Sequence, residues 1–258
     1  TTADGKYVIT FHIEDVSSRS DDPGFQRFVI GKKGGSVAGY RQMIWEMHPH
    51  STIVKVAVDG SGSQIVHEED YYFGHANPSP TLPNIMTFCH EGNWNVVENR
   101  IWGLNIDTGE CWPIRENAPD EAIGHEYWML DGEHIGFHGR TPNGPVYGSI
   151  RYDNTEHIEA PFTYGSTHFH SLTLDTIVGD GSATDPYLLM WKFRGDSFEG
   201  PRVLAWHRGS FHVGRVHTHP CCSPYAPQVV YTSDPEGYGQ IYLVDIPEWE
   251  NLPERTAL

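Results

Sequence analysis

The chain has 258 residues and alternates short apolar runs with polar turns, and no stretch shows the period of a long amphipathic helix. Runs bounded by turn residues such as Asp-Gly, Pro-Asn and Asp-Pro-Glu-Gly predict short β-strands joined by hairpins. We expect strands at Tyr7–Ile13, Gln42–Met47, Ile53–Val58, Ile85–Phe88, Arg100–Asn105, His134–Phe137, Val146–Tyr152, Thr176–Val178, Tyr187–Phe193, Val203–Trp206, Val229–Thr232 and Gln240–Asp245.

A repeat along the chain indicates how these strands are grouped. A histidine opens four similar units, and successive histidines are 50, 43 and 49 residues apart: His75, His125, His168 and His217. Periods of roughly 40–50 residues with four short strands each are typical of β-propeller blades. A double-sheet sandwich is the competing fold, but it gives no reason for this spacing. The sequence therefore predicts an all-β protein, a single β-propeller domain over residues 1–258 with about five blade units.

The segment from Val16 to Gly39 interrupts the pattern in the first of these units. It is polar and rich in glycine, with the run Gly31-Lys32-Lys33-Gly34-Gly35 near its end. Long connections of this composition lie at protein surfaces. We expect residues 16–39 to form a surface insertion.

The charge balance excludes several classes of partner. The chain carries 17 Lys and Arg against 34 Asp and Glu, a formal net charge of −17. Nucleic-acid binders need a basic face that displaces counterions from phosphates, and anionic membranes attract basic segments. No apolar run approaches the roughly 18 residues of a membrane span. We therefore expect neither a nucleic-acid nor a membrane partner.

The four cysteines predict a reducing compartment. Cys89, Cys111, Cys221 and Cys222 have neither the CxxC spacing of a zinc ribbon nor the density of a disulfide framework. We expect them to be reduced, and the protein to be cytoplasmic. The adjacent Cys221 and Cys222 are read as small buried apolar residues rather than as a redox pair.

Sixteen histidines supply the candidate chemistry. The innermost strand of each propeller blade lines a central channel, so the opening histidines of successive units would converge there. His217 and His219 are two residues apart and would point to one face of a strand, where both imidazoles can reach one metal ion. The alternative is a polar pair that hydrogen-bonds to neighbouring loops. His168 and His170 repeat the spacing, and an all-imidazole site suits Mn, Fe, Zn or Ni without selecting among them.

Each of three further residues has either a functional or a purely structural interpretation. His125 is a candidate general base, because imidazole titrates near neutral pH, or else a hydrogen-bonded channel histidine. Arg100 would clamp a carboxylate with its planar guanidinium, or form a surface ion pair with Glu98 or another acid. His90 would contact a ligand or belong to a loop turn.

Six short stretches together resemble the oligogalacturonate lyases, a polysaccharide-lyase family built on a seven-bladed β-propeller. They occur in the family's order and cover the chain from about His75 to Ile246. The matching stretches are Thr87-Phe88-Cys89-His90-Glu91-Gly92, Arg100-Ile101-Trp102, Gly124-His125-Glu126-Tyr127-Trp128, Val178-Gly179-Asp180-Gly181, His217-Thr218-His219-Pro220 and Tyr231-Thr232-Ser233-Asp234-Pro235-Glu236-Gly237.

The resemblance implies roles for particular residues. His217 and His219 would bind a divalent transition metal, typically Mn²⁺, together with His168, and His170 is the fallback for this third ligand. The family's base falls on His125. Its substrate-carboxylate arginine falls on Arg100. His90 and His170 are further expected to contact the substrate.

The chain departs from the family pattern at two points. Gly214 occupies the position of the family's fourth metal ligand, a glutamine. The chain is also short for seven blades, which would need about 300 residues or more at this period. We therefore expect it to lack N-terminal blades, or else to form a smaller propeller.

The activity implied by the resemblance is lyase chemistry on pectin fragments. Short oligogalacturonides would be cleaved by metal-dependent β-elimination to 4,5-unsaturated uronides. Two alternatives stay open: a lyase acting on another uronide, and a non-catalytic or divergent propeller that binds a sugar or a protein partner.

Overall fold

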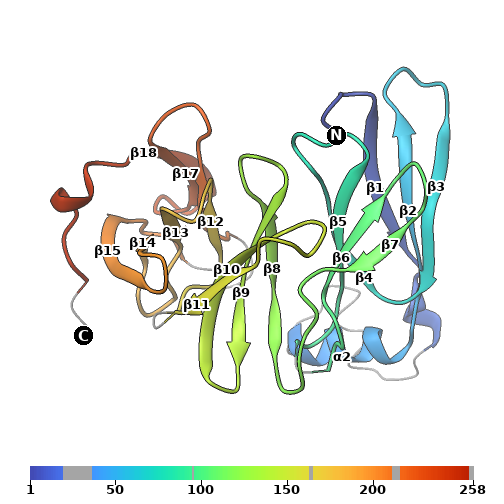
Figure 1. The fold of residues 1–258 in the computed structure, drawn as a ribbon, viewed down its shortest axis with the longest axis horizontal. Coiled ribbons are helices and arrows are strands. Elements are labelled where there is room, and N and C mark those ends of the chain that lie inside the picture. The colour runs from blue at the N-terminus through green and yellow to red at the C-terminus, as the bar shows by residue number, and fades with distance from the viewer. Residues whose placement is uncertain (20–36, 95, 163–164, 211–215, 256–258) are drawn as a thin grey trace. The chain divides into compact units, whose positions relative to one another are not determined.

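The computed structural model describes residues 1–19, 37–94, 96–162, 165–210 and 216–255. These residues form five small antiparallel sheets of three or four strands each (Figure 1). They divide into two compact units, Thr1–Gly124 with Tyr152–Asn154, and His125–Arg151 with Thr155–Leu258. Each unit is described separately below.

The first unit holds two sheets and the helical segments. One sheet has three strands, β1 (Tyr7–Ile13), β2 (His50–Ala57) and β3 (Ser63–Asp70). The next has four, β4 (Phe73–Pro78), β5 (Ile85–His90), β6 (Ile101–Asn105) and β7 (Cys111–Pro113). The helical segments are the 3₁₀ turn η1 (Val16–Arg19) and the α-helix α2 (Val37–Glu46).

The second unit holds three sheets. The first strand of the first of these sheets, β8, begins in the first unit at Ala122. These sheets comprise β8 (Ala122–Trp128), β9 (His134–Thr141), β10 (Gly144–Arg151) and β11 (Ile158–Pro161); β12 (Phe169–Ser171), β13 (Ile177–Gly179), β14 (Tyr187–Phe193) and β15 (Phe198–Trp206); and β16 (Cys221–Cys222), β17 (Gln228–Ser233) and β18 (Gln240–Asp245). A 3₁₀ turn, η2 (Trp249–Asn251), follows the last strand. Both cysteines of β16 were expected to be buried; Cys222 is buried, but the prediction is wrong for Cys221, which is exposed because neighbouring residues of a strand point to opposite faces.

Strands within every sheet are neighbours in the order of the sequence, which is the up-and-down order of propeller blades. The predicted all-β propeller fold is therefore confirmed, with five blade-like sheets as the repeat indicated. The recurring histidines mark first strands. His75 lies in β4 and His125 in β8, while His168 directly precedes β12 and His217 lies shortly before β16.

Apolar residues from neighbouring strands form a core within each unit. In the first unit, Ile53, Phe73, Met86, Phe88 and Leu104 are all at most 1% exposed and pack together. All six residues of β5 are buried, so this strand is covered on both faces. The second unit has two such clusters, built around Trp191 with Tyr147 and around Met190 with Trp249.

The helix α2 corrects one sequence prediction, because Gln42–Met47 was expected to be a strand. Ile44 is buried against Val16, and Met43 and Met47 pack against the same cluster. This spacing of three and four residues is helical, and a short apolar run does not distinguish it from a strand. Among the described residues, no helix has the length and hydropathy that a membrane span requires.

The predicted surface insertion, residues 16–39, is described only at its two ends. Val16 begins η1 and is buried, and Val37 begins α2. Residues 20–36 lie outside the described part of the chain.

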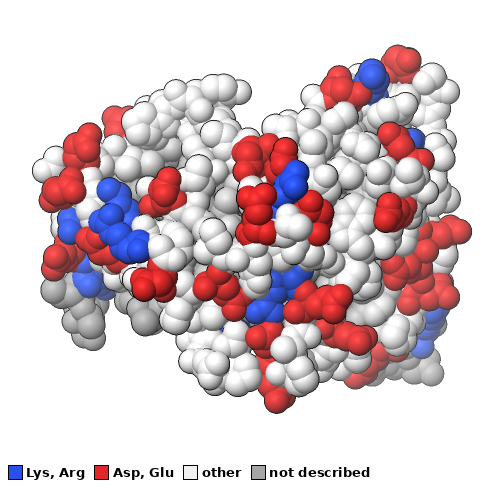
Figure 2. All heavy atoms as spheres, viewed as in Figure 1, with Lys and Arg blue, Asp and Glu red and all other residues white. Residues whose placement is uncertain are grey.

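Acidic side chains are distributed over the face shown in Figure 2, with Lys and Arg in smaller groups among them. Several Lys and Arg side chains of the described residues form ion pairs with acids. Lys55 Nζ lies 3.2 Å from Asp107 Oδ1, and Arg151 Nη2 lies 2.7 Å from Glu133 Oε2. An anionic ligand therefore needs a local source of positive charge on this protein.

A matched pair of glycine substitutions tests the turn after β13. Gly181 and Gly195 both have positive φ, +66° and +95°. A Cβ at Gly181 would lie 2.2 Å from the Asp185 carbonyl oxygen, whereas at Gly195 it would meet nothing within 4 Å. We expect Gly195→Ala to lower the free energy of unfolding by about 1–2 kcal/mol. Gly181→Ala should cost roughly 1–3 kcal/mol more, because the clash adds to the strain. Urea unfolding of the two variants measures this, and equal losses would contradict it.

Candidate functional site

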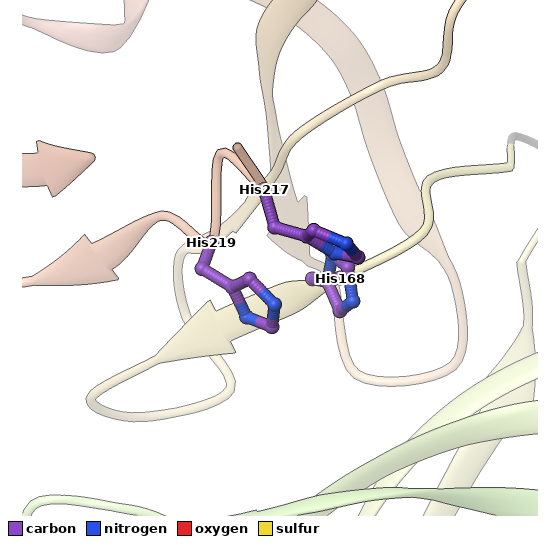
Figure 3. Close-up of side chains that lie close together, drawn as sticks. All are labelled: His168, His217 and His219. Carbon is purple, nitrogen blue, oxygen red and sulfur yellow. The ribbon is translucent and has the colours of Figure 1, made fainter. Parts of the chain in front are cut away.

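Three imidazoles lie close together in the second unit (Figure 3). One ring nitrogen from each of His168, His217 and His219 lies within 4.8 Å of the other two. The ring centroids of His168 and His219 are 3.7 Å apart, and those of His217 and His219 are 5.4 Å apart. All three residues precede first strands, His168 before β12 and the other two before β16. The blade repeat therefore assembles this group from segments about 50 residues apart in sequence.

A buried carboxylate orients His168. Asp180 Oδ2 accepts a hydrogen bond from His168 Nδ1 at 2.7 Å, and Asp180 is fully buried. Its other oxygen accepts the backbone N–H groups of Thr167 and His168 and the hydroxyl of Ser166. Burial alone would raise the pKa of Asp180, but the hydrogen bonds from His168 hold it below its ordinary value. The carboxylate is thus an acceptor, which makes Nδ1 the donor and leaves the lone pair on Nε2.

This arrangement fits a divalent transition metal. Imidazole nitrogens are suitable ligands for such ions, and a carboxylate on the far nitrogen of a ligating histidine is a common supporting contact. His168, His217 and His219 are the residues that would hold the ion. Gly214, at the position of the family's glutamine ligand, lies outside the described residues.

His125 lies beside this group. Its ring centroid is 5.3 Å from that of His168, and its Nδ1 is 2.9 Å from Nε2 of His138 on β9. The backbone of His125 has a φ of +52°, in the left-handed region that few residues other than glycine adopt. Non-glycine residues in this region often occur at functional sites. The four imidazoles of His125, His168, His217 and His219 therefore converge within one unit.

His170 makes different contacts. Its Nδ1 accepts the backbone N–H of Cys222 at 3.1 Å, and its ring stacks on Tyr127 with centroids 5.0 Å apart. Burial lowers the pKa of His170 to about 4. The structure thus groups His168, rather than the fallback His170, with the histidine pair before β16.

A pocket of about 420 Å³ adjoins His217. It is lined in part by Asp234, Tyr238 and Gln240, which lie in or beside β17 and β18. Asp234 belongs to one of the stretches that resemble the lyase family. This pocket places hydrogen-bonding groups next to the imidazoles.

Arg100 belongs to the first unit and is 2% exposed. Its Nη1 and Nη2 lie 3.1 and 3.3 Å from the two carboxylate oxygens of Glu91. The guanidinium also lies over the ring of Trp94, 5.5 Å from its centroid. The alternative was a surface ion pair with Glu98 or another acid; Arg100 does pair with another acid, Glu91, but the surface location is wrong, because the pair is buried. Burial alone would raise the pKa of Glu91, but the charge of Arg100 lowers it below its ordinary value.

His90 also belongs to the first unit, at the end of β5. It is buried, and its ring stacks on Tyr71 with centroids 3.8 Å apart and lies 4.7 Å from Trp102. These three residues help to line a pocket of about 400 Å³. His90 is therefore a strand residue and not part of a loop turn.

Two functional candidates were missed by the sequence reasoning, Asp180 and His138. Asp180 lies in the Val178-Gly179-Asp180-Gly181 stretch, whose glycines flank an acidic residue and were a usable signal. For His138 the sequence contained no such signal, because its position opposite His125 depends on the packing of β8 against β9.

The chain is similar to known oligogalacturonate lyases. Residues 39–141 match the model of the Pectate_lyase22 family, described as oligogalacturonate lyase. The chain is 24% identical to an oligogalacturonide lyase from Pectobacterium atrosepticum, over 80% of this chain and 58% of the relative. A solved oligogalacturonate lyase in complex with manganese matches with a TM-score of 0.76 at 21% identity, over 94% of this chain and 63% of the other.

The resemblance to the oligogalacturonate lyases is confirmed. The chain spans about three-fifths of the length of these lyases. The family match, residues 39–141, includes His90, Arg100 and His125. The fold also resembles the β-propeller domain of the Trilobed protease from Pyrococcus furiosus, with a TM-score of 0.50 and 12% identity over 80% of this chain.

Replacing the buried carboxylate tests its role. Asp180→Asn should weaken Mn²⁺ binding about 10- to 100-fold, because the amide no longer fixes the His168 ring as a carboxylate does. Isothermal titration calorimetry with Mn²⁺ alone measures this. The control Asp175→Asn changes an exposed residue of the same sheet region and should bind as the unaltered protein does. Equal affinities for all three proteins would refute the role.

Proposed function

We propose that the protein is a metal-dependent lyase that cleaves short oligogalacturonides by β-elimination and releases 4,5-unsaturated uronides. The observation that carries this proposal is the convergence of His125 with His168, His217 and His219 in one unit. It joins a candidate base to a candidate cation site. The similarity to oligogalacturonate lyases supplies the substrate class.

Mn²⁺ is the ion that we propose for the three imidazoles, because the matching lyase structure is a manganese complex. When bound, such an ion would stabilise negative charge on the uronate carboxylate. The all-imidazole ligand set supports a transition metal rather than Ca²⁺ or Mg²⁺, which prefer oxygen ligands.

His125 is the proposed base for the proton on C5 of the sugar. The electron pair of the broken C5–H bond forms the double bond between C4 and C5, and the C4–O bond breaks. The departing oxygen takes a proton from solvent. For this step the lone pair of His125 must lie on Nε2, so Nδ1 must donate its hydrogen to His138 Nε2, 2.9 Å away. We therefore assign His138 the role of holding His125 in this tautomer.

Arg100 is proposed to assist at the substrate carboxylate. Glu91 fixes the plane of its guanidinium by contacting both terminal nitrogens. Arginine presents its N–H donors in a planar arrangement that suits recognition of a carboxylate. His90 and His170 are proposed as further substrate contacts.

A cytoplasmic location completes the proposal. The four cysteines, all within the described residues, are present as thiols. Reduced cysteines are typical of the cytosol, where glutathione and thioredoxin keep them in that state.

A direct assay tests the activity. Incubation with short oligogalacturonides and Mn²⁺ should raise the ultraviolet absorbance, because the product contains a conjugated double bond. His125→Ala should lower the rate by about 10²- to 10⁴-fold, the usual contribution of a general base. The matched control His157→Ala removes a half-exposed imidazole of the same unit and should leave the rate unchanged. If no uronide gives an absorbance change, the lyase function is rejected; a change with another uronide only would reject the substrate.

The tautomer role of His138 has its own test. His138→Ala should reduce kcat by roughly 100-fold, since small misplacements of a catalytic group have effects of this size. KM and Mn²⁺ affinity should stay the same. His138→Gln, whose amide oxygen can accept the same hydrogen bond, should recover much of the rate. Failure of the glutamine variant to exceed the alanine variant would contradict this role.

A further inference from the structure

A second group of metal-type donors lies in the first unit. We call it the β3–β7 cluster, and it consists of His67 and Glu69 on β3 and Cys111 on β7. One donor atom from each lies within 4.8 Å of the other two. His67 Nε2 is 2.5 Å from Glu69 Oε1.

The backbone explains why these three side chains meet. His67 and Glu69 are two residues apart on one strand, so they project from the same face. Cys111 begins the last strand of the next sheet. The turn before it approaches β3 closely, since a Cβ on Gly109 would lie 3.6 Å from the carbonyl oxygen of Val66. The cluster therefore joins the outer strands of two successive sheets within one unit.

The surroundings of the cluster are largely apolar and aromatic. The His67 ring stacks on Phe73 with centroids 5.8 Å apart and lies 5.4 Å from Phe88. The side chains of His67 and Glu69 are 15% and 31% exposed. The imidazole, the carboxylate and the thiol are thus partly buried in apolar surroundings, where a bound cation would compensate for the water that they have lost.

A fourth side chain, that of His90, supports the interpretation of this cluster as a metal site. The His90 side chain is only 8% exposed. Its Nε2 is buried and makes no hydrogen bond of standard geometry among the described residues. It lies 3.3 Å from Glu69 Oε2, the carboxylate oxygen that His67 does not contact. Glu69 is thus placed between two imidazoles.

We propose that the β3–β7 cluster binds one divalent metal ion of the zinc class through His67, Glu69 and Cys111, with His90 holding the Glu69 carboxylate in position. Zinc takes nitrogen, oxygen and thiolate ligands at about 2.0–2.3 Å, so the donor atoms of a tetrahedral site are about 3.3–3.8 Å apart. The donor atoms of the cluster lie between 2.5 Å and at most 4.8 Å apart, a range that includes this spacing. A water molecule would occupy the fourth position, and the thiol proton would leave to solvent on binding.

The cluster differs from the imidazole group of the second unit in its ligand chemistry. A thiolate selects zinc-class ions over Mn²⁺, whereas three imidazoles do not exclude manganese. An ion here would connect β3 to β7 and so stabilise the first unit. This inference does not depend on the proposed lyase activity.

Co²⁺ titration tests the site, because a cobalt–thiolate bond gives a charge-transfer absorption that imidazole and carboxylate ligands do not. The metal-stripped full chain with His217→Ala and His219→Ala is used, so that the imidazole group of the second unit does not compete. The absorption should saturate at one Co²⁺ per chain and be displaced by Zn²⁺. The metal should also raise the temperature of thermal unfolding.

Substitutions assign the ligands. Cys111→Ser should abolish the thiolate absorption, while the matched control Cys221→Ser, an exposed cysteine of the second unit, should retain it. His90→Gln should weaken Co²⁺ affinity about 10- to 100-fold, as is usual for residues that support a ligand. If Cys111→Ser does not fold, as judged by circular dichroism, His67→Gln replaces it and should weaken binding at least as much as His90→Gln. Absence of the absorption, its loss in Cys221→Ser, or unchanged affinity in His67→Gln would overturn the proposal.

Discussion

The buried carboxylate of Asp180 is the interaction on which the candidate site depends most directly. A fully buried anion is stable only when hydrogen bonds replace its lost water, and here the donors come from Ser166, Thr167 and His168. Those donors belong to the segment that leads into β12, so satisfying the charge also fixes that segment. The His168 imidazole is consequently held by its ring nitrogen and by its own backbone. The need to satisfy the buried Asp180 carboxylate thereby determines the position of the His168 ring within the histidine group.

The fold could be predicted from the sequence at several strands whose apolar residues show a clear period. Tyr7–Ile13, Tyr187–Phe193 and Gln240–Asp245 agree residue for residue with β1, β14 and β18. The strands β3, β4 and β8 were missed, because polar or charged residues interrupt their apolar positions. The strands β12 and β16 were also missed, because three and two residues are too few for any periodic signal. Their existence follows from pairing with β13 and β17, which is a tertiary property. Gln42–Met47 failed for the related reason that a short apolar run fits a helix equally well.

The part of the candidate site that could be predicted is the set of histidines that open the repeat units. The opening histidines mark first strands, and three of them lie together in the structure, with His168 centroids 5.3 Å from His125 and 5.6 Å from His217. Partners set by tertiary packing were not predictable. Asp180 is twelve residues from His168, and the identity of the Arg100 partner, Glu91 rather than Glu98, depends on which side chains are buried together. The catalytic roles themselves stay predictions until the variants are assayed.

The electrostatics of the Arg100 pair bears on why a metal ion would be needed. Glu91 lies against the guanidinium, so the two together carry no net charge, and the protein as a whole carries −17. An anionic ligand approaching this surface meets repulsion from the overall field, and the arginine offers it directed N–H donors while its ion pair carries no net charge. A bound cation would add the positive charge that this pair lacks. Imidazoles suit that task, because as neutral ligands they leave the full charge of a bound dication available to an anionic ligand.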